Sequence, residues 1–155
     1  MLRALTLSLT LLASIVIGAF AADAQRDPIS DRGGSAIKGY DTVAYWTEGK
    51  AVKGNKKITS EYKGATFRFA SAENKALFDA NPEKYIPEYG GYCAWAIGSS
   101  ATGFAPGNGK YWKIVDGKLY VNYNGGVQKK WEKDIPGFIE NGDKNWSQNE
   151  FHESN

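Results

Sequence analysis

Few side chains in this sequence can do chemistry. The one cysteine, Cys93, lies in the stretch YGGYCAWA, and the one histidine, His152, lies in the polar stretch NEFHESN. A cysteine becomes a nucleophile where a base or a cationic neighbourhood favours its thiolate, and histidine is the usual base. No histidine is near Cys93, and there is no C-x-x-C pair. We therefore expect no enzymatic activity.

Metal binding is also limited by the number of soft ligands. A copper(I) or zinc site uses two to four thiolate or imidazole groups, and one copy of this chain offers Cys93 and His152. This excludes a closed structural zinc site. A Cys93 pair across a homodimer can still hold copper(I) linearly, with Asp41, Glu73 or Glu88 adding oxygen ligands.

Three interpretations of Cys93 stay open. A free cysteine is often a small buried residue beside the core. It can instead contact a ligand at the mouth of a pocket, or form an intermolecular disulfide. The preceding Gly90 and Gly91 indicate a loop with positive φ, which can form one wall of such a pocket. The candidate pocket residues are Tyr40, Asp41, Tyr45, Trp46, Tyr92 and Trp95, although such aromatic residues are more often part of the core.

The first residues have the pattern of a cleaved secretory signal. Arg3 is followed by an uncharged, mostly apolar run over residues 5–20 and then by the small-residue motifs AFA and ADA. This pattern predicts a signal peptide at residues 1–24 and a mature chain that is periplasmic or secreted. No second apolar segment is long enough to span a bilayer, so we expect no membrane span in the mature chain.

Composition and charge predict one globular domain without a nucleic-acid partner. The formal net charge is +2, and the charges are interspersed along the chain. A basic patch of the kind that binds nucleic acid is therefore not indicated. We expect a flexible linker at residues 25–36, one domain at residues 37–148 and a disordered tail at residues 149–155.

Two segments predict β-hairpins. Residues 58–71 read ITSEYKGATFRFAS, with a Lys-Gly turn and with Phe67 and Phe69 on one face. Residues 111–124 read YWKIVDGKLYVNYN, with the Asp-Gly dipeptide typical of a type I′ turn. The run VAYW at residues 43–46 is a further strand candidate.

Short helices are expected between and after these hairpins. Ser71 is a suitable N-cap for a helix at residues 72–80, which would turn Ala76, Leu77 and Ala80 toward the core and place Phe78 at the edge. Further helical segments are predicted from residue 82, at 125–134 and at 136–146, whereas residues 92–98 fit either a strand or a helix. The predicted fold class is α+β, a small antiparallel sheet of hairpins with short packed helices, and without an internal repeat.

Several segments resemble the exported single-domain branch of the YHS domain family. They are KGYDTVAYWTEGKAVKG, YKGATFRFASAENKALFDANPEKYIPEYGGYCA and LYVNYNGGVQKKWEKDIPGFIENGDKNW. The resemblance runs from about Lys38 to Trp146. It implies a small sheet with a helix after the FRFAS strand.

The resemblance also implies a role with metals. The YHS family is associated with copper pumps, mercury reductases and metal-sensing modules, whose cysteines match Ala44, Ala70 and Asn74 here. The thiolates of those relatives are thus replaced, and Cys93 is the candidate ligand for a transition metal such as copper or zinc. We expect an exported binding module for a metal ion or small ligand near Cys93. The alternative is a non-catalytic structural or interaction domain that meets a protein partner and buries Cys93.

Overall fold

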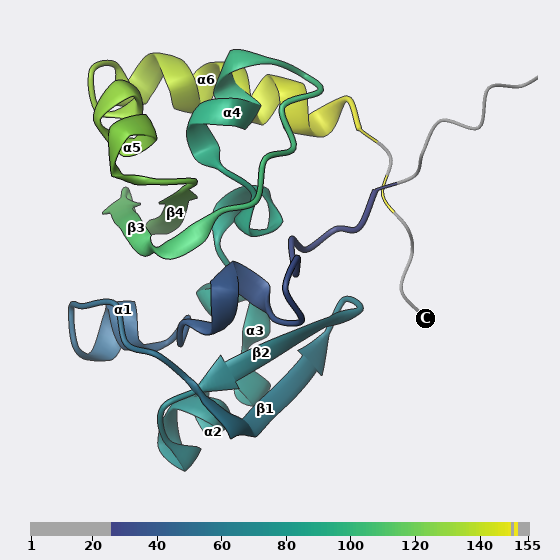
Figure 1. Ribbon diagram of the computed structural model, residues 1–155, viewed down its shortest axis with the longest axis vertical. Helices are drawn as coiled ribbons and strands as arrows, with labels where there is room; N and C mark the ends of the chain where they lie inside the picture. Colours follow the sequence, from purple (N-terminus) through teal and green to yellow (C-terminus); the bar gives the residue numbers. More distant parts are fainter. Residues whose placement is uncertain (1–25, 150, 152–155) are drawn as a thin grey trace, which may run out of the picture.

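Residues 26–149 and 151 are described by a computed structural model of the chain. The predicted signal peptide at residues 1–24 lies outside the described residues, and so does His152. The predicted α+β class is confirmed, because two small antiparallel sheets are packed with short helices. Figure 1 shows two halves along the long axis of the molecule, with the segment after Arg26 running between them.

The first half, called unit 1, spans residues 36–85. Its elements are a 3-10 helix η1 (Ala36–Gly39), α1 (Ala44–Thr47), β1 (Asn55–Tyr62), β2 (Ala65–Phe69), α2 (Ala72–Ala80) and α3 (Pro82–Tyr85). β1 and β2 form the predicted hairpin. Lys63 and Gly64 have φ values of 48° and 76°, the left-handed pair that a type I′ turn requires.

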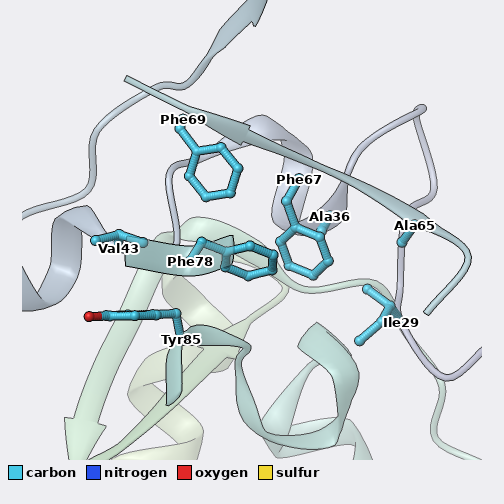
Figure 2. Close-up of a cluster of buried hydrophobic side chains, with 8 residues drawn as sticks. All are labelled: Ile29, Ala36, Val43, Ala65, Phe67, Phe69, Phe78 and Tyr85. Atoms are coloured by element: carbon cyan, nitrogen blue, oxygen red, sulfur yellow. The ribbon is translucent and has the colours of Figure 1, made fainter. Parts of the chain in front are cut away.

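Unit 1 builds its core from β2 and α2. Phe67 and Phe69 point to one side of the hairpin, and the ring centroid of Phe78 lies 4.7 and 5.0 Å from theirs. Figure 2 shows these three rings converging beside Val43 and Tyr85. The predicted N-cap is confirmed, because the Ser71 hydroxyl accepts the Asn74 N–H at 3.1 Å.

Two local predictions in unit 1 are wrong. The run VAYW is not a strand, because the Asp41 carboxylate accepts the N–H groups of Val43 and Ala44 and so starts helix α1. In α2 the buried side is also different: Phe78 is 1% exposed and Leu77 is 43% exposed. Asn74 is the second buried residue of this helix, and Ala76 and Ala80 are exposed.

The second half, called unit 2, spans residues 88–147. Its elements are a 3-10 helix η2 (Glu88–Gly91), α4 (Ala94–Ser99), β3 (Asn108–Val115), β4 (Lys118–Asn122), α5 (Gly125–Trp131) and α6 (Ile135–Ser147). The Asp116-Gly117 turn has φ values of 49° and 74°, so the predicted type I′ hairpin is confirmed. The sequence left residues 92–98 open between a strand and a helix, and the structure has the helix α4 there.

Unit 2 repeats unit 1 element by element. Each unit runs through a 3-10 turn, a short helix, a hairpin with a type I′ turn, a capped helix and a further helix. Ser71 caps α2, and Asn124 caps α5 by accepting the Val127 N–H at 2.9 Å. The expectation of no internal repeat is therefore wrong. The reason is that the units share a backbone path while most of their side chains differ.

The same hydrogen bonds occur in both units. The bond from Asp41 N to Val52 O in unit 1 matches that from Cys93 N to Ala105 O in unit 2, both at 2.8 Å. The bond from Gly54 N to Gly39 O (2.9 Å) matches that from Gly107 N to Gly91 O (3.0 Å). The bond from Lys57 N to Asn55 Oδ1 (2.8 Å) matches that from Lys110 N to Asn108 Oδ1 (3.0 Å). These bonds fix the correspondence of residues, so Asp41 in unit 1 corresponds to Cys93 in unit 2.

A small core joins the two units. Ile37 and Tyr45 of unit 1 pack with Leu119 and Val121 of unit 2, and all four are buried. The Tyr45 hydroxyl donates to the Gly109 carbonyl at 2.6 Å across this junction. The junction holds the 3-10 turn of unit 1 against the sheet of unit 2.

The ends of the described chain lie together. Arg26 forms a parallel bridge with Phe151, and Ile29 is buried in the core of unit 1. These residues come from the predicted linker and the predicted tail, whose boundaries stay a prediction. No helix within residues 26–149 is long and apolar enough to cross a membrane.

Candidate functional site

Cys93 lies directly before α4, at its N-cap position, and is 0% exposed. Its Sγ accepts the Tyr123 N–H at 3.3 Å, and its thiol donates to Asn122 Oδ1 at 3.6 Å. The same Asn122 oxygen accepts the Trp95 N–H at 3.1 Å. The side chain of Asn122 therefore ties the start of α4 to the end of β4.

The thiol of Cys93 is held in its neutral form. Burial raises its pKa, and the N–H groups of Ala96, Tyr123 and Trp95 that face the sulfur oppose this only in part. Among the described residues, the groups that act on the pKa of this thiol include neither a base nor a cationic side chain. A protonated thiol is a poor nucleophile and a poor metal ligand, because both roles use the thiolate.

A pocket of about 170 Å³ opens above this sulfur. Its lining is Cys93, Trp95, Ala96, Ala105, Tyr123 and Val127. Cys93 is the floor, since it is fully buried, and Tyr123 is at the mouth, since it is 46% exposed. None of the lining side chains is charged, so the pocket suits an apolar group.

Unit 1 has a closed polar cluster where unit 2 has this pocket. The Asp41 carboxylate, 0% exposed, accepts Val43 N and Ala44 N through Oδ1 at 2.8 and 3.3 Å. Through Oδ2 it accepts Ala70 N at 2.7 Å and the Asn74 side-chain amide at 2.8 Å. Each carboxylate oxygen thus has two donors, and the carboxylate has no acceptor position left over for a ligand.

The two sites correspond residue by residue. The correspondence follows from the shared hydrogen bonds and from the two N-caps. The corresponding residues, with unit 1 named first, are Asp41 and Cys93, Val43 and Trp95, Ala44 and Ala96, Val52 and Ala105, Ala70 and Tyr123, and Asn74 and Val127. The decisive change is in the last pair. Asn74 reaches Asp41 with its amide, whereas Val127 has no group that can bond to the sulfur, and an open pocket lies between them.

The other residues predicted for a pocket lie elsewhere. Tyr45 is in the junction core, with Trp46 beside it. Tyr92 packs edge-on against Phe104 and donates to the Asp27 carbonyl at 3.1 Å. Tyr40 lies under Lys53, whose Nζ is 3.9 Å from the ring centroid. Of the predicted residues, Cys93 and Trp95 line the pocket.

Sequence reasoning missed Tyr123 and Val127. They lie about thirty residues after Cys93 and reach it because the β3–β4 hairpin folds back. The sequence does contain a signal that could have indicated them. Asn124 is an N-cap residue that follows β4 as Ser71 follows β2, and it lies between Tyr123 and the first turn of α5 with Val127.

The described side chains do not fit a multidentate metal site. Within residues 26–149 and 151, no three or more His, Cys, Asp or Glu side chains are grouped to hold a metal ion. Glu88, a candidate oxygen ligand, instead pairs with Lys118 at 3.4 Å.

A larger pocket of about 300 Å³ includes Pro28, Tyr89 and Trp146 in its lining. Three lining residues are charged: Lys63 and Glu83 pair with each other at 2.7 Å, and Glu88 pairs with Lys118. The larger volume therefore brings no unmatched functional group, and the Cys93 pocket is the better candidate.

Comparison with known proteins supports a family for unit 1. The YHS domain model matches residues 43–89, which run from the start of α1 into η2. This segment is similar to a YHS domain, while Cys93 and nearly all of unit 2 lie outside the match. No curated protein and no solved structure matches the chain significantly.

Proposed function

We propose that this chain is an exported, non-catalytic binding module of the YHS type, whose small ligand places an apolar group in the Cys93 pocket. One observation carries the proposal. The repeat presents the same site twice, and a polar cluster fills it in unit 1 whereas unit 2 keeps an open apolar pocket.

A small organic ligand fits this pocket better than a metal ion. The YHS family is associated with metal handling, and its cysteines match Ala44, Ala70 and Asn74 in unit 1. Their counterparts in unit 2 are Ala96, Tyr123 and Val127, so no thiol occupies these positions in either unit. Cys93 alone contributes sulfur, and burial keeps it protonated.

The same surroundings support binding without catalysis. The sulfur faces backbone N–H groups and the Asn122 carbonyl oxygen, none of which can take its proton at neutral pH. A reaction at Cys93 needs a nearby base. The pocket thus offers shape and apolar surface rather than a reactive group.

Native mass spectrometry of protein recovered from the exported fraction, without added reductant, tests this function. We expect an organic molecule that leaves on denaturation, together with a free, unmodified thiol. Val127→Trp fills the pocket and should lose the added mass. Lys129→Trp changes an exposed residue of the same helix outside the pocket lining, and should keep it.

Two results would contradict the proposal. One is a bound copper or zinc ion that Cys93→Ser removes, which would make the site a thiolate metal site. The other is an organic adduct that persists in Val127→Trp, which would place the ligand elsewhere on the chain.

A further inference from the structure

We infer that the ligand of the Cys93 pocket is a small amphipathic anion, an aromatic or short branched group that carries a carboxylate. This inference rests on the proposed function and names the chemical class of its ligand. It follows from the cations around the mouth of the pocket.

Each aromatic wall of the pocket carries a lysine. Lys130 Nζ lies 5.3 Å from the ring centroid of Trp95, and Lys38 Nζ lies 5.7 Å from that of Tyr123. An ammonium group within about 6 Å of a ring centroid is attracted to the ring face. The two walls therefore hold positive charge next to an apolar opening.

Lys38 extends this charge into a cluster. Lys53 Nζ donates to the Lys38 carbonyl at 2.7 Å, and Arg68 Nη2 donates to the Gly34 carbonyl at 3.3 Å. Burial is the main cause that lowers the pKa of Lys53, and the nearby charges of Arg68 and Lys38 lower it further. Cations this close repel one another, and a bound anion would reduce the repulsion.

No carboxylate of the chain neutralises these cations within the described residues. The ion pairs found there use other lysines, namely Lys50, Lys63, Lys75, Lys113 and Lys118. Asp41, close in sequence to Lys38, is buried and saturated by its own donors. The positive charge at the mouth of the Cys93 pocket is therefore available to attract an anionic ligand.

The backbone at Lys38 supports a role for its side chain. Lys38 has φ 59°, and its counterpart in unit 2 is Gly90 with φ 57°. Glycine adopts this left-handed conformation freely, whereas a residue with a side chain is strained in it. Strained residues are concentrated at functional sites. Ile37 beside it has a positive φ as well, and of these two residues Lys38 is the one that carries an ammonium group, which faces Tyr123.

The pocket and the cations together define the ligand. The lining has no charged side chain, so an anionic group stays at the mouth, where Lys38 and Lys130 lie. The volume of about 170 Å³ admits one ring or a short branched chain rather than a long acyl chain. An arylacetate has this division between an apolar body and a carboxylate.

Isothermal titration with phenylacetate, phenylacetamide and acetate tests the inference. Phenylacetate should bind about tenfold more tightly than phenylacetamide at low salt, because the two ammonium groups at the mouth attract its carboxylate. The difference should shrink in high salt, and acetate should not bind. Lys38→Met with Lys130→Met should remove the difference, whereas Lys129→Met, an exposed lysine on the same helix as Lys130, should keep it.

The outcomes separate the two claims. Equal binding of phenylacetate and phenylacetamide overturns the anionic class and leaves the apolar pocket standing. If neither binds the wild-type chain, the apolar pocket fails as well. If phenylacetate binds Val127→Trp as it binds the wild type, the cations act without the pocket, and the inference is overturned.

Discussion

The repeat predicts that two corresponding residues, Asp41 in unit 1 and Cys93 in unit 2, contribute unequally to the stability of the fold. Asp41→Ala removes the acceptor of three backbone N–H groups and of the Asn74 amide. A buried donor without a partner costs about 1–3 kcal/mol. Three backbone donors at about 1.3 kcal/mol each give a loss of about 4 kcal/mol, if the Asn74 amide can turn away.

Cys93→Ala is the matched change in unit 2. Of the N–H groups that face the sulfur, Tyr123 N–H is the one at hydrogen-bond geometry, and Trp95 N–H bonds to Asn122 Oδ1 instead. The change removes this one bond and a weak donor to Asn122. Because Tyr123 is half-exposed, water can replace the lost partner, and the expected cost is about 1–2 kcal/mol. The two variants should therefore differ by about 2–3 kcal/mol in their free energy of unfolding.

Urea unfolding, monitored by tryptophan fluorescence, measures the free energy of unfolding of both variants. The comparison holds if the m-value is the same in both. For a chain of this size the Asp41→Ala loss corresponds to a fall in Tm of roughly 15 °C. Equal losses in the two variants, or a loss below about 1 kcal/mol in Asp41→Ala, would refute the view that unit 1 is closed by this carboxylate.

Three further results are expected. Phe78→Ala should lower the free energy of unfolding by about 4 kcal/mol and Leu77→Ala by less than about 0.5 kcal/mol in the same urea assay, because only Phe78 is buried; similar losses would contradict the packing. Cys93 should not react with a disulfide reagent at pH 8 until the chain is unfolded, because it is buried and its pKa is raised; rapid labelling of the native chain would count against the sheltered thiol. Burial raises the pKa of Tyr45 and of Tyr89, where the Asp143 hydrogen bond adds to the effect, so their stabilisation is complete below the ordinary tyrosine pKa of 10.0 and is lost above it. The free energy of unfolding should thus fall above about pH 10, and constant stability from pH 9 to 11.5 in urea titrations would contradict this.

The hairpins and the helix caps were predictable because their signals are local. The Asp116-Gly117 dipeptide specifies its turn without reference to the rest of the chain, and Ser71 caps α2 through a bond three residues away. The buried side of α2 was not predictable in this way. A nine-residue helix has several possible faces, and the choice of Phe78 over Leu77 depends on where the β2 rings lie.

The candidate site was predictable only where it is continuous in sequence. Cys93 and Trp95 are neighbours, so both were found. Tyr123 and Val127 reach the pocket through the β3–β4 hairpin. The repeat was missed for a related reason: the equivalence of Asp41 and Cys93 lies in hydrogen bonds of the folded chain, and a carboxylate and a thiol do not match by residue type.

A titration of the chain with indole, followed by backbone amide NMR, tests the central claim most directly, because unit 1 is an internal control. Indole should shift the amides of Trp95, Ala96, Tyr123 and Val127, whose side chains line the pocket. It should leave those of their counterparts Val43, Ala44, Ala70 and Asn74 unchanged. Shifts that fall equally on both sets, or that avoid the Cys93 pocket, would contradict the claim that unit 2 holds the binding site.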